Sequence, residues 1–436
     1  MIDRTLLSTD FEVTARRLGR KGVPHGTLEE VRELLGRRRE LTTRVDESRA
    51  ELRRSSEGIG RLLQQKKAEE AEEMKAKIPG LKDQIASLEA QLGETEEKVD
   101  YHLLRIPNMP SDEAPEGLTE DSNVVRSVHG YDRAAFEGRT FRPHWDIATE
   151  LGIYDAERAT KISGSMFALL RGQGARLLRA LVEFGLELNR DRYEEYVVPH
   201  FVRTDTFTGT GHLPKFEVDA YRFRDDDLWA IPTGEVPLMG IHRGEILEAS
   251  ELPKRYMTYT ACFRREAGSA GKDTRGMQRL HEFHKVEVLK LCTPEQVQPE
   301  FEAMLLDARR PLDLLGLPYR IVDLCCGDLT FSATRLFDLE VYAPGVDRWL
   351  EVSSVGIFSD FQARRGNIRF RPEPKAKPQF VHALNGSALA TPRVWAAVIE
   401  HGQQPDGTVR IPEPLVRYMG TDVIKPLGGQ LRANAR

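Results

Sequence analysis

The sequence is poor in cysteine and in long apolar runs, and each shortage excludes a class of protein. Its 436 residues include only four cysteines, Cys262, Cys292, Cys325 and Cys326, with no CxxC pair and no Cys/His ligand spacing. This pattern is typical of free thiols in a reducing compartment, and we expect no zinc site. No stretch approaches the roughly 18 uninterrupted apolar residues of a membrane span, and the N-terminus lacks a signal-peptide pattern. We therefore expect a soluble, cytoplasmic protein.

An excess of charge of one sign is also missing. The chain has 63 lysines and arginines against 68 aspartates and glutamates, a formal net charge of -5. This balance excludes a uniformly basic, non-specific nucleic-acid binder, so any RNA contact must come from local patches. The length and the 40% hydrophobic content allow one large core and an appendage. We expect two domains.

Heptad spacing is the strongest pattern in the first hundred residues. Thr27 followed by Glu30 fits a capping box and predicts a helix start. Apolar residues then follow two ladders on each side of a polar stretch at 64–73: Val31, Val45, Leu52 and Ile59 with Leu34, Leu41 and Leu62, then Ile78, Ile85, Leu92 and Val99 with Met74, Leu81 and Leu88. They predict an antiparallel coiled-coil hairpin of two helices, each of roughly 35 to 40 residues, kinked at Pro79-Gly80.

Periodicity alone does not say what this hairpin does. A dimerising or spacer coiled coil is one reading, and an RNA-binding arm is the other. Basic residues in the first helix and at the turn favour RNA: Arg37, Arg38, Arg39, Arg44, Arg49, Arg53, Arg54, Arg61, Lys66 and Lys67. Since the second helix is rich in glutamate, we expect some of these charges to pair across the hairpin.

A stretch rich in proline and acids, 105–123, marks a domain boundary. We expect a helical hairpin over 1–110, a linker over 111–125 and a catalytic domain over 126–436. In the last part, extended runs at 196–198, 256–263 and 285–291 do not alternate strictly with the helical runs at 174–189 and 294–315. This order predicts an α+β fold on a largely antiparallel sheet, flanked by helices.

Four clusters carry residues suited to chemistry. They read PTGEVPL from Pro232, FRREAGSAGKDTRGMQRLHEFHKVE from Phe263, EVSSVGIFSDFQARR from Glu351 and NGSALATPR from Asn385. In the second cluster one strand ends at Phe263, a glycine-rich loop follows, and a second strand carries Phe283 and Glu287. Such a hairpin can clamp ATP, because arginine neutralises phosphate, an aromatic ring stacks on adenine, and glycine allows close backbone approach.

The four clusters, in this order, resemble the TxE element, motif 2, the acidic element and motif 3 of class II seryl-tRNA synthetases of the bacterial type. The similarity runs from the hairpin to Pro426 and includes PHWDIA from Pro143 and GTGHLPKF from Gly209. The resemblance implies a seven-stranded type of antiparallel catalytic sheet and a tRNA-binding hairpin. It also implies ATP-dependent serine–tRNA ligase activity, with tRNA(Ser) as acceptor and tRNA(Sec) as a second candidate.

The resemblance assigns residues to each substrate. Serine would be bound by a set from three clusters: Thr233, Gly234, Glu235, Arg264, Glu287, Asn385 and Ser387. ATP would be bound by Arg264, Arg265, Glu266, Arg279, Leu280, Phe283, Glu351, Val352, Ser353, Ser354 and Arg393. Arg264, Glu287 and Arg393 are the expected catalytic residues, and Glu351 with Ser354 would hold the Mg²⁺ that accompanies ATP.

Further expectations concern assembly and alternatives. Motif 1, matched loosely by the helix 174–189 and the segment ending at Pro199, implies a homodimer around Pro199. Gly234 stands where alanine is common in relatives, a change we expect to be harmless if the residue contributes mainly backbone. A carrier-protein ligase on the same fold would lack the long hairpin, and an inactive paralogue would have lost motif residues such as Arg264 or Arg393. The sequence does not separate a housekeeping enzyme from a resistance or secondary-metabolism duplicate.

Overall fold

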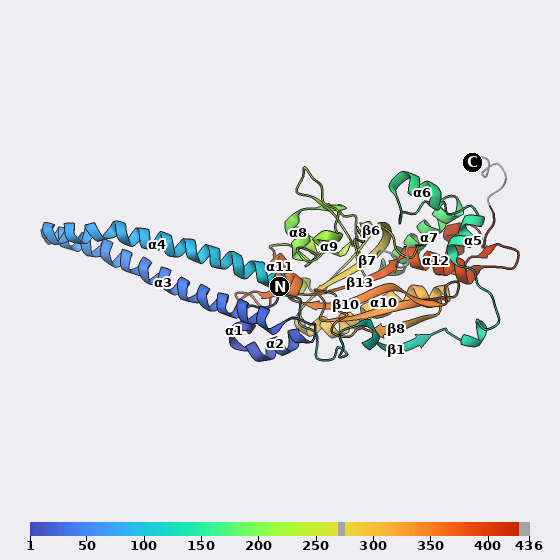
Figure 1. The fold of residues 1–436 in the computed structure, drawn as a ribbon, viewed down its shortest axis with the longest axis horizontal. Helices are drawn as coiled ribbons and strands as arrows, with labels where there is room; N and C mark the ends of the chain where they lie inside the picture. Colours follow the sequence, from blue (N-terminus) through green and yellow to red (C-terminus); the bar gives the residue numbers. More distant parts are fainter. Residues whose placement is uncertain (269–274, 427–436) are drawn as a thin grey trace. The chain divides into compact units, whose positions relative to one another are not determined.

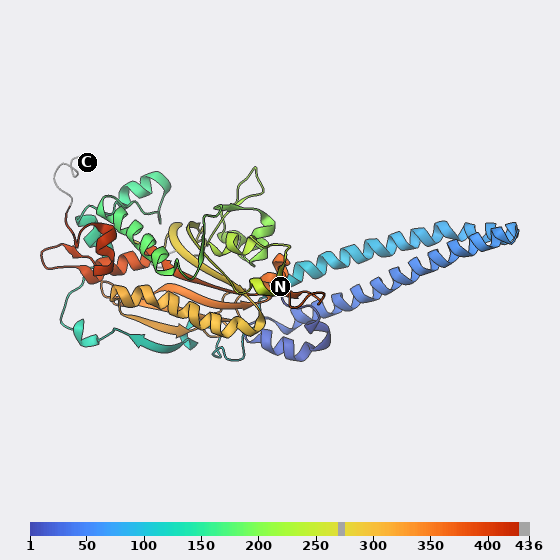
Figure 2. The same ribbon diagram turned by 180° about the vertical axis from the view of Figure 1, so that it is seen from behind.

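The computed structural model describes residues 1–268 and 275–426. The chain divides into two compact units, one over residues 2–107 and one over 108–436 together with Met1. Figures 1 and 2 show the two units from opposite sides. Within the described ranges, no helix is both long enough and apolar enough to cross a membrane.

The first unit is all helical. Two short helices, α1 (Leu6–Thr9) and α2 (Phe11–Gly19), precede two long ones, α3 (His25–Gln64) and α4 (Ala68–Leu103). The long helices have 40 and 36 residues, which confirms the length that the heptad ladders predict. The predicted helix start at Thr27 is wrong: α3 begins two residues earlier, after Pro24, and no side chain caps it. Pro24 takes the N-cap position with an extended backbone, φ -64° and ψ 136°, so Thr27 already lies inside the first turn of the helix.

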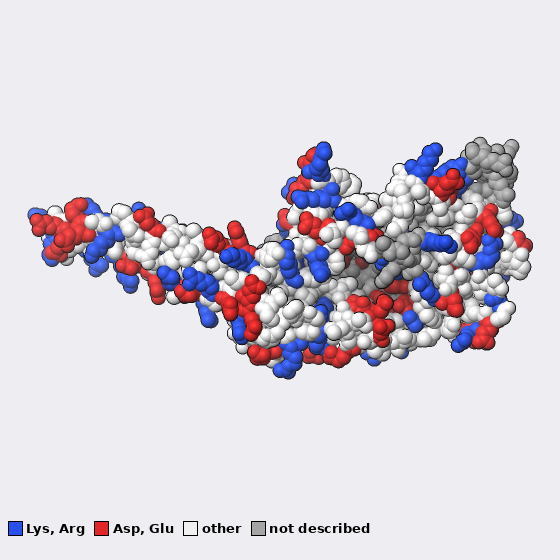
Figure 3. All heavy atoms as spheres, viewed as in Figure 1, with Lys and Arg blue, Asp and Glu red and all other residues white. Residues whose placement is uncertain are grey.

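The predicted seam is found between the two long helices. Leu41 and Val45 of α3 pack with Leu88 and Leu92 of α4 in one apolar cluster. The helix α4 continues through Pro79, so this proline does not end it. A hairpin whose apolar seam is this narrow leaves most of its surface to charged side chains, and Figure 3 shows both signs of charge along it.

The second unit is built on an eight-stranded sheet in the order β1-β8-β9-β10-β13-β7-β6-β2. Its strands are β1 (Val124–His129), β2 (Glu194–Tyr196), β6 (Lys254–Phe263), β7 (Glu282–Cys292), β8 (Tyr319–Asp323), β9 (Arg335–Ala343), β10 (Arg348–Ser359) and β13 (His382–Ala390). All neighbours are antiparallel except β2 and β6, which are parallel. The largely antiparallel sheet is therefore confirmed, with eight strands where the resemblance implied seven.

Helices cover this sheet and surround its ends. They are α5 (His144–Glu150), α6 (Ala156–Ser163), α7 (Gln173–Asn189), α8 (Thr204–Gly209), α9 (Glu235–Gly240), α10 (Val297–Leu315), α11 (Phe361–Gly366), α12 (Thr391–Gly402) and α13 (Glu413–Met419). Short strands form three small sheets: β5 (Ile246–Glu248) with β11 (Arg369–Arg371) and β12 (Gln379–Phe380), β3 (Phe201–Val202) with β4 (Trp229–Ala230), and β14 (Val409–Arg410) with β15 (Val423–Ile424). Single 3₁₀ turns lie at 120–122, 133–135, 217–219, 249–251 and 294–296.

The two faces of the sheet have different uses, and β7 shows why. Val286 and Val288 belong to the large core beneath α7, α10 and α12. Because side chains alternate along a strand, Lys285 and Glu287 point to the opposite face. Leu289 continues this second face and packs in another apolar cluster that includes residues of α9. The sheet thus carries its main core on one face and polar groups on the other.

Candidate active site

The polar face of the sheet opens into a cleft of about 1140 Å³ within the second unit. The cleft is lined by side chains from all four clusters that the sequence singles out: Thr233, Glu235, Arg264, Glu266, Arg279, Leu280, Phe283, Glu351, Val352, Ser354, Asn385, Ser387 and Arg393. Four other predicted site residues do not line it: Gly234, Arg265, Glu287 and Ser353. The fold therefore brings together residues that are more than 150 positions apart in the chain.

Glu287 lies behind the residues that line the cleft. Its side chain is buried, and Asn385 Nδ2 donates to its Oε1 at 2.6 Å. Thr233 Oγ1 donates to its Oε2 at 3.1 Å, and the Lys285 ammonium pairs with the same oxygen. Both carboxylate oxygens are thus held by donors. The sequence analysis missed Lys285, although a lysine two residues before a glutamate on a strand must share its face.

Glu235, at the start of α9, is the second carboxyl group of this region. Gln362 Nε2 donates to its Oε1 at 2.5 Å. Burial, with a smaller contribution from the nearby charge of Glu287, raises the pKa of Glu235 to about 7 against the opposing hydrogen bond from Gln362. A cation placed in the cleft beside Glu235 would return this carboxyl group to its ionised form.

Gly234 has no room for a side chain. A β-carbon built there would lie 2.7 Å from Thr258 Cγ2 and 3.1 Å from Glu287 Cβ. Thr258 stands opposite Glu287 in the β6–β7 ladder. An alanine at this position would therefore press on Thr258 of β6 and Glu287 of β7. That glycine stands here without harm stays a prediction.

The hairpin of β6 and β7 places an arginine against an aromatic ring. The Arg264 guanidinium carbon lies 4.9 Å from the centre of the Phe283 ring, and its Nε donates to the carbonyl of Pro232 at 3.3 Å. The backbone of Arg264 is fixed by His281, which accepts from its N–H and contacts its carbonyl through Nδ1. This arrangement offers one cation and one ring face to the cleft.

The residues that follow Arg264 diverge. The Arg265 guanidinium donates to the carbonyl of Val218 at 3.2 Å, outside the cleft. Glu266 has a positive φ of 50° and turns back so that its carboxylate pairs with Arg279 at 3.3 Å. Glu266 and Arg279 both line the cleft.

At the opposite wall, β9 and β10 bring acidic and hydroxyl groups together. Ser354 Oγ donates to Asp338 Oδ1 at 2.6 Å, and the two residues are register partners. Burial and the neighbouring charge of Glu351 hold the pKa of Asp338 well above its usual range. Ser353, on the other side of β10, donates to the Ser387 carbonyl at 2.6 Å. Asp338 escaped the sequence analysis because only the strand register places it beside Ser354.

Arg393, at the start of α12, joins this wall to the hairpin. Its Nη1 donates to the carbonyl of Glu351 at 2.6 Å and lies 3.5 Å from the Glu351 carboxylate. Its Nε donates to the carbonyl of Gln278 at 3.0 Å. Arg393 thus holds two sides of the cleft together.

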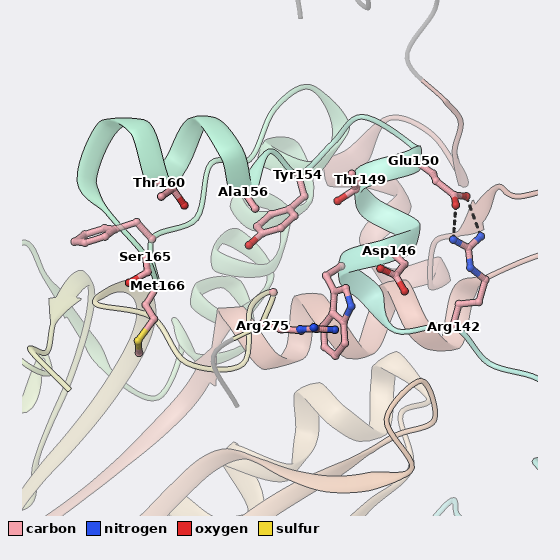
Figure 4. Close-up of a pocket in the computed structure, with 13 residues that line it drawn as sticks. Arg142, Asp146, Thr149, Glu150, Tyr154, Ala156, Thr160, Ser165, Met166 and Arg275 are labelled. Atoms are coloured by element: carbon pink, nitrogen blue, oxygen red, sulfur yellow. Dashed lines mark hydrogen bonds and ion pairs between the residues drawn. The ribbon is translucent and has the colours of Figure 1, made fainter. Parts of the chain in front are cut away.

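A second, smaller groove of about 650 Å³ is lined by residues of α5 and α6 together with Arg275 and Gly276. Figure 4 shows its lining from α5 and α6, with the ion pair between Arg142 and Glu150 at one end. None of the predicted site residues lines this groove. The four cysteines are buried and unpaired with one another, and over residues 1–268 and 275–426 no group of three His, Cys, Asp or Glu side chains is arranged to hold a metal ion.

Comparison with known proteins agrees with this geometry. The family profile described as "Seryl-tRNA synthetase N-terminal domain" matches residues 1–110, and that of the "tRNA synthetase class II core domain (G, H, P, S and T)" matches residues 216–402. The chain is 44% identical over 404 residues to a serine–tRNA ligase of Dehalococcoides mccartyi, covering 91% of this chain and 94% of that one. It is 45% identical over 423 residues to a serine–tRNA ligase of Bacillus pumilus, covering 96% and 99%.

Solved structures give the same answer. The crystal structure of seryl-tRNA synthetase from Pyrococcus horikoshii complexed with ATP superposes with a TM-score of 0.92 at 34% identity, covering 98% of this chain and 100% of that one. The cytoplasmic serine–tRNA ligase of Naegleria fowleri in complex with AMP superposes with a TM-score of 0.86 at 25% identity, covering 98% and 99%. Since the similarity spans both units and nearly the whole of each relative, this chain belongs to the seryl-tRNA synthetase family of class II aminoacyl-tRNA synthetases.

Proposed function

We propose that this protein activates L-serine with ATP to form seryl-adenylate and then transfers serine to the 3′ end of tRNA(Ser). The observation that carries the proposal is the cleft, in which a buried acceptor network around Glu287 lies beside an arginine and an aromatic ring. A small polar amino acid fits the first part, and a nucleotide fits the second. Relatives named serine–tRNA ligase at 44% and 45% identity favour serine over other amino acids.

Serine would be recognised at both of its ends. The α-ammonium group would lie beside Glu235, where its charge favours the ionised carboxylate, with Thr233 adjacent. The hydroxyl would reach the group formed by Glu287, Asn385 and Ser387. Because Glu287 is already bonded to Thr233, Lys285 and Asn385, its orientation is fixed before serine arrives. Pre-organised polar groups of this kind reject an amino acid that lacks the hydroxyl.

ATP would occupy the hairpin end of the cleft. Adenine would stack on Phe283, with Leu280 at its edge and Glu266 near its amino group. Arg264 would contact both the serine carboxylate and the α-phosphate, while Arg393 and Arg279 would contact the outer phosphates. Arg265 would act through the position it gives to Glu266, since its guanidinium is bonded outside the cleft.

The acidic wall fits a magnesium ion bound together with ATP. Glu351, Ser354 and the adjoining Asp338 supply hard oxygen donors, and Ser354 donates to Asp338 at 2.6 Å. Glu351 and Ser354 would hold the ion, with Val352 and Ser353 setting their place on β10. When bound, Mg²⁺ would neutralise charge on the phosphates.

The reaction needs position and charge more than proton transfer. A serine carboxylate oxygen attacks the α-phosphorus, the bond to the β-phosphate oxygen breaks, and pyrophosphate leaves. A hydroxyl of the terminal ribose of tRNA then attacks the acyl carbon, and AMP leaves with the bonding electron pair. Arg264 would orient the attacking carboxylate and stabilise the charge that gathers on the α-phosphate.

The helical hairpin would grip tRNA through arginines of α3. Arg38 and Arg49 are paired across the hairpin with Glu96 and Glu89, at 3.0 Å and 2.7 Å. Among the described residues, no ion pair involves Arg53 or Arg54, which lie nearer the turn. Arg53 and Arg54 therefore present charge that no carboxylate neutralises, and the tRNA backbone is a matching partner. tRNA(Sec) is a second candidate acceptor, and we place the reaction in the cytoplasm.

A homodimer would form around Pro199. The strand β2 lies at the edge of the eight-stranded sheet, and the segment after it exposes 97% of Val197. An exposed edge strand followed by a bare apolar side chain is suited to cover by a second copy of the chain. A sedimentation measurement that gave a monomer at micromolar concentration would contradict this assembly.

Two assays on one preparation test the function. Serine-dependent ATP–pyrophosphate exchange measures the first step, and charging of unfractionated tRNA with labelled serine measures the second. A carrier-protein ligase would show exchange without charging, and an inactive paralogue would show neither. Both outcomes would refute the proposal.

A further inference from the structure

Two buried side chains outside the cleft, His144 and Glu400, have no part in the chemistry proposed above. His144 begins α5 and is 1% exposed, and Glu400 lies in α12 and is fully buried. The Oε1 atom of Glu400 accepts from the backbone N–H of His144 at 3.0 Å and contacts its Nδ1 at 2.8 Å. Its Oε2 accepts from the N–H of Gly345 at 2.8 Å. Both oxygens of the carboxylate are therefore engaged.

The tautomer of His144 follows from its other nitrogen. The backbone N–H of Met277 donates to His144 Nε2 at 2.9 Å, and a backbone N–H cannot accept. The Nε2 atom must then carry a lone pair, and the ring proton must sit on Nδ1, where it is donated to Glu400. The imidazole thus joins a carboxylate of α12 to the backbone of Met277 in one defined orientation.

Helix α12 also holds Gln278, the residue after Met277. Arg393, about two turns before Glu400 on α12, donates from Nε to the carbonyl of Gln278 at 3.0 Å. The backbones of two neighbouring residues are therefore held to α12. The N–H of Met277 is held through His144 and Glu400, and the carbonyl of Gln278 is held by Arg393. Both Met277 and Gln278 line the catalytic cleft.

The segment is pressed closely against the ring. A β-carbon on Gly276 would lie 2.2 Å from His144 Nε2 and 3.0 Å from the Trp145 ring, and Gly276 has a φ of +63°. On its outer side this segment lines the groove of Figure 4 through Arg275. Successive residues of this segment thus line both cavities: Arg275 and Gly276 line the groove, and Met277 and Gln278 line the cleft.

We propose that His144 is a positioning residue for ATP binding. This inference rests on the proposed function. The hydrogen-bonded pair of His144 and Glu400 fixes the position of Met277 and Gln278. That place in turn fixes the guanidinium of Arg393 and the neighbouring Leu280, which line the cleft. Small displacements of groups that contact a substrate lower rates strongly, by up to about 10²-fold for 1 Å.

The backbone before His144 is anchored independently of its ring. Gln403 accepts from the N–H of Arg142 at 3.0 Å and donates to its carbonyl at 3.3 Å. Gly345 is packed against the same carbonyl, since a β-carbon there would lie 2.5 Å from it. Altering the ring of His144 should therefore leave the start of α5 in place, and Gln403 offers a matched control in the same region.

Two substitutions separate the two ends of the ring. His144→Asn keeps a donor near the Nδ1 position for Glu400 but removes the acceptor for the N–H of Met277. His144→Gln places an acceptor near the Nε2 position and restores that contact. Gln403→Ala removes the hydrogen bonds to the backbone of Arg142 and to the backbone carbonyl of Glu400, and it leaves the Glu400 carboxylate, His144 and Met277 unchanged. It therefore serves as the control for local destabilisation.

Three quantities are measured for each variant: amide hydrogen exchange of a peptide covering residues 275–280, the KM values for ATP and serine in pyrophosphate exchange, and Tm. His144→Asn should lose protection in the peptide and raise the KM for ATP by roughly 10- to 100-fold, with the KM for serine within about twofold. His144→Gln should recover most of both losses. Gln403→Ala should lower Tm and leave the KM for ATP unchanged.

A purely structural role predicts a different result. If His144→Asn lowers Tm as Gln403→Ala does while peptide exchange and the KM for ATP stay at wild-type values, the proposal is overturned. Should His144→Asn fail to fold, His144→Gln carries the test. A His144→Gln variant with the Tm of wild type, a raised KM for ATP and lost protection of the peptide would overturn the acceptor role assigned to Nε2. Absence of serine-dependent exchange in the wild type would refute the proposed function, whereas peptide exchange would still test the positioning.

Discussion

The amide of Asn385 donates to the carboxylate of Glu287 at 2.6 Å, and these two buried side chains lie on the neighbouring strands β13 and β7. Asn385 also donates to the carbonyl of Val288 at 3.2 Å, so its amide is fixed from two directions. A carboxylate held in this way is a directional acceptor. The contact therefore bears on how serine is told apart from smaller amino acids.

The first prediction concerns that selectivity. The wild-type protein should activate alanine about 10⁴-fold less efficiently than serine, because a buried acceptor would be left unpaired. Asn385→Ala should lower kcat/KM for serine by about 10- to 100-fold, because it removes a hydrogen bond to a charged group. The preference for serine over alanine, as the ratio of their kcat/KM values, should become smaller. Pyrophosphate exchange with each amino acid measures both. A wild-type ratio within about tenfold would contradict the assignment of this pocket to a hydroxyl.

The second prediction concerns Arg264. Arg264→Ala should lower the rate of adenylate formation by about 10² to 10³, because it removes charge that acts on the transition state. Arg224→Ala is the control, since that side chain is 91% exposed and, among the described residues, its ion pair is with its neighbour Asp225. Single-turnover formation of AMP-linked serine would report the step directly. Similar rates of adenylate formation in Arg264→Ala and Arg224→Ala would show that Arg264 takes no part in the reaction.

The third prediction follows from the raised pKa of Glu235, about 7. Below this pH the carboxyl group is protonated, and serine's ammonium must displace the proton to bind. The KM for serine should therefore fall about tenfold between pH 6 and pH 8. Glu235→Gln should bind serine weakly and lose this pH dependence. A KM for serine that does not change with pH in the wild type would count against the pairing.

The same shift affects stability. Because the folded state raises the pKa of Glu235 above the ordinary value of 4.5, its contribution is complete below about 4.5 and is lost as the pH rises through about 7. The full difference amounts to about 3 kcal/mol. Without substrates, Tm of Glu235→Gln relative to wild type should thus be higher at pH 8 than at pH 5.5. Thermal unfolding at the two pH values measures it.

The local sequence pattern was enough to predict contacts within one β-hairpin or along one heptad ladder. Arg264 and Phe283 could be placed together because β6 and β7 are consecutive strands that pair with each other, and the seam of Leu41 with Leu88 follows from the heptads. The partners of Ser354 and Glu235 could not be found, because Asp338 depends on the register of β9 and β10, and Gln362 lies 127 residues from Glu235. Contacts that only the tertiary fold creates leave no periodic signal in a single sequence.

The fourth prediction separates the hairpin from catalysis. Deleting residues 27–100 should leave serine activation nearly intact, because all the lining residues of the cleft lie beyond the first unit. Charging of tRNA should collapse. Arg53→Ala and Arg54→Ala should weaken tRNA binding and make its salt dependence shallower by about one unit for each lost phosphate contact. Arg37→Ala, whose side chain is paired with Glu40, is the control. Normal charging by the deletion variant would assign the hairpin to structure or dimerisation.

The last prediction uses the close packing around Gly234. Gly234→Ala should weaken serine activation and lower stability by about 1 to 3 kcal/mol, the usual cost of overfilling a packed site, because the new methyl group would meet Thr258 Cγ2 at 2.7 Å. Thr258→Ser removes that methyl group while keeping the hydroxyl, so the double variant should regain most of the loss. A double-mutant cycle on Tm and on kcat/KM for serine measures the coupling. Additive effects would mean that Gly234 and Thr258 do not press on each other, and the close contact with the strand of Glu287 would then have no bearing on serine binding.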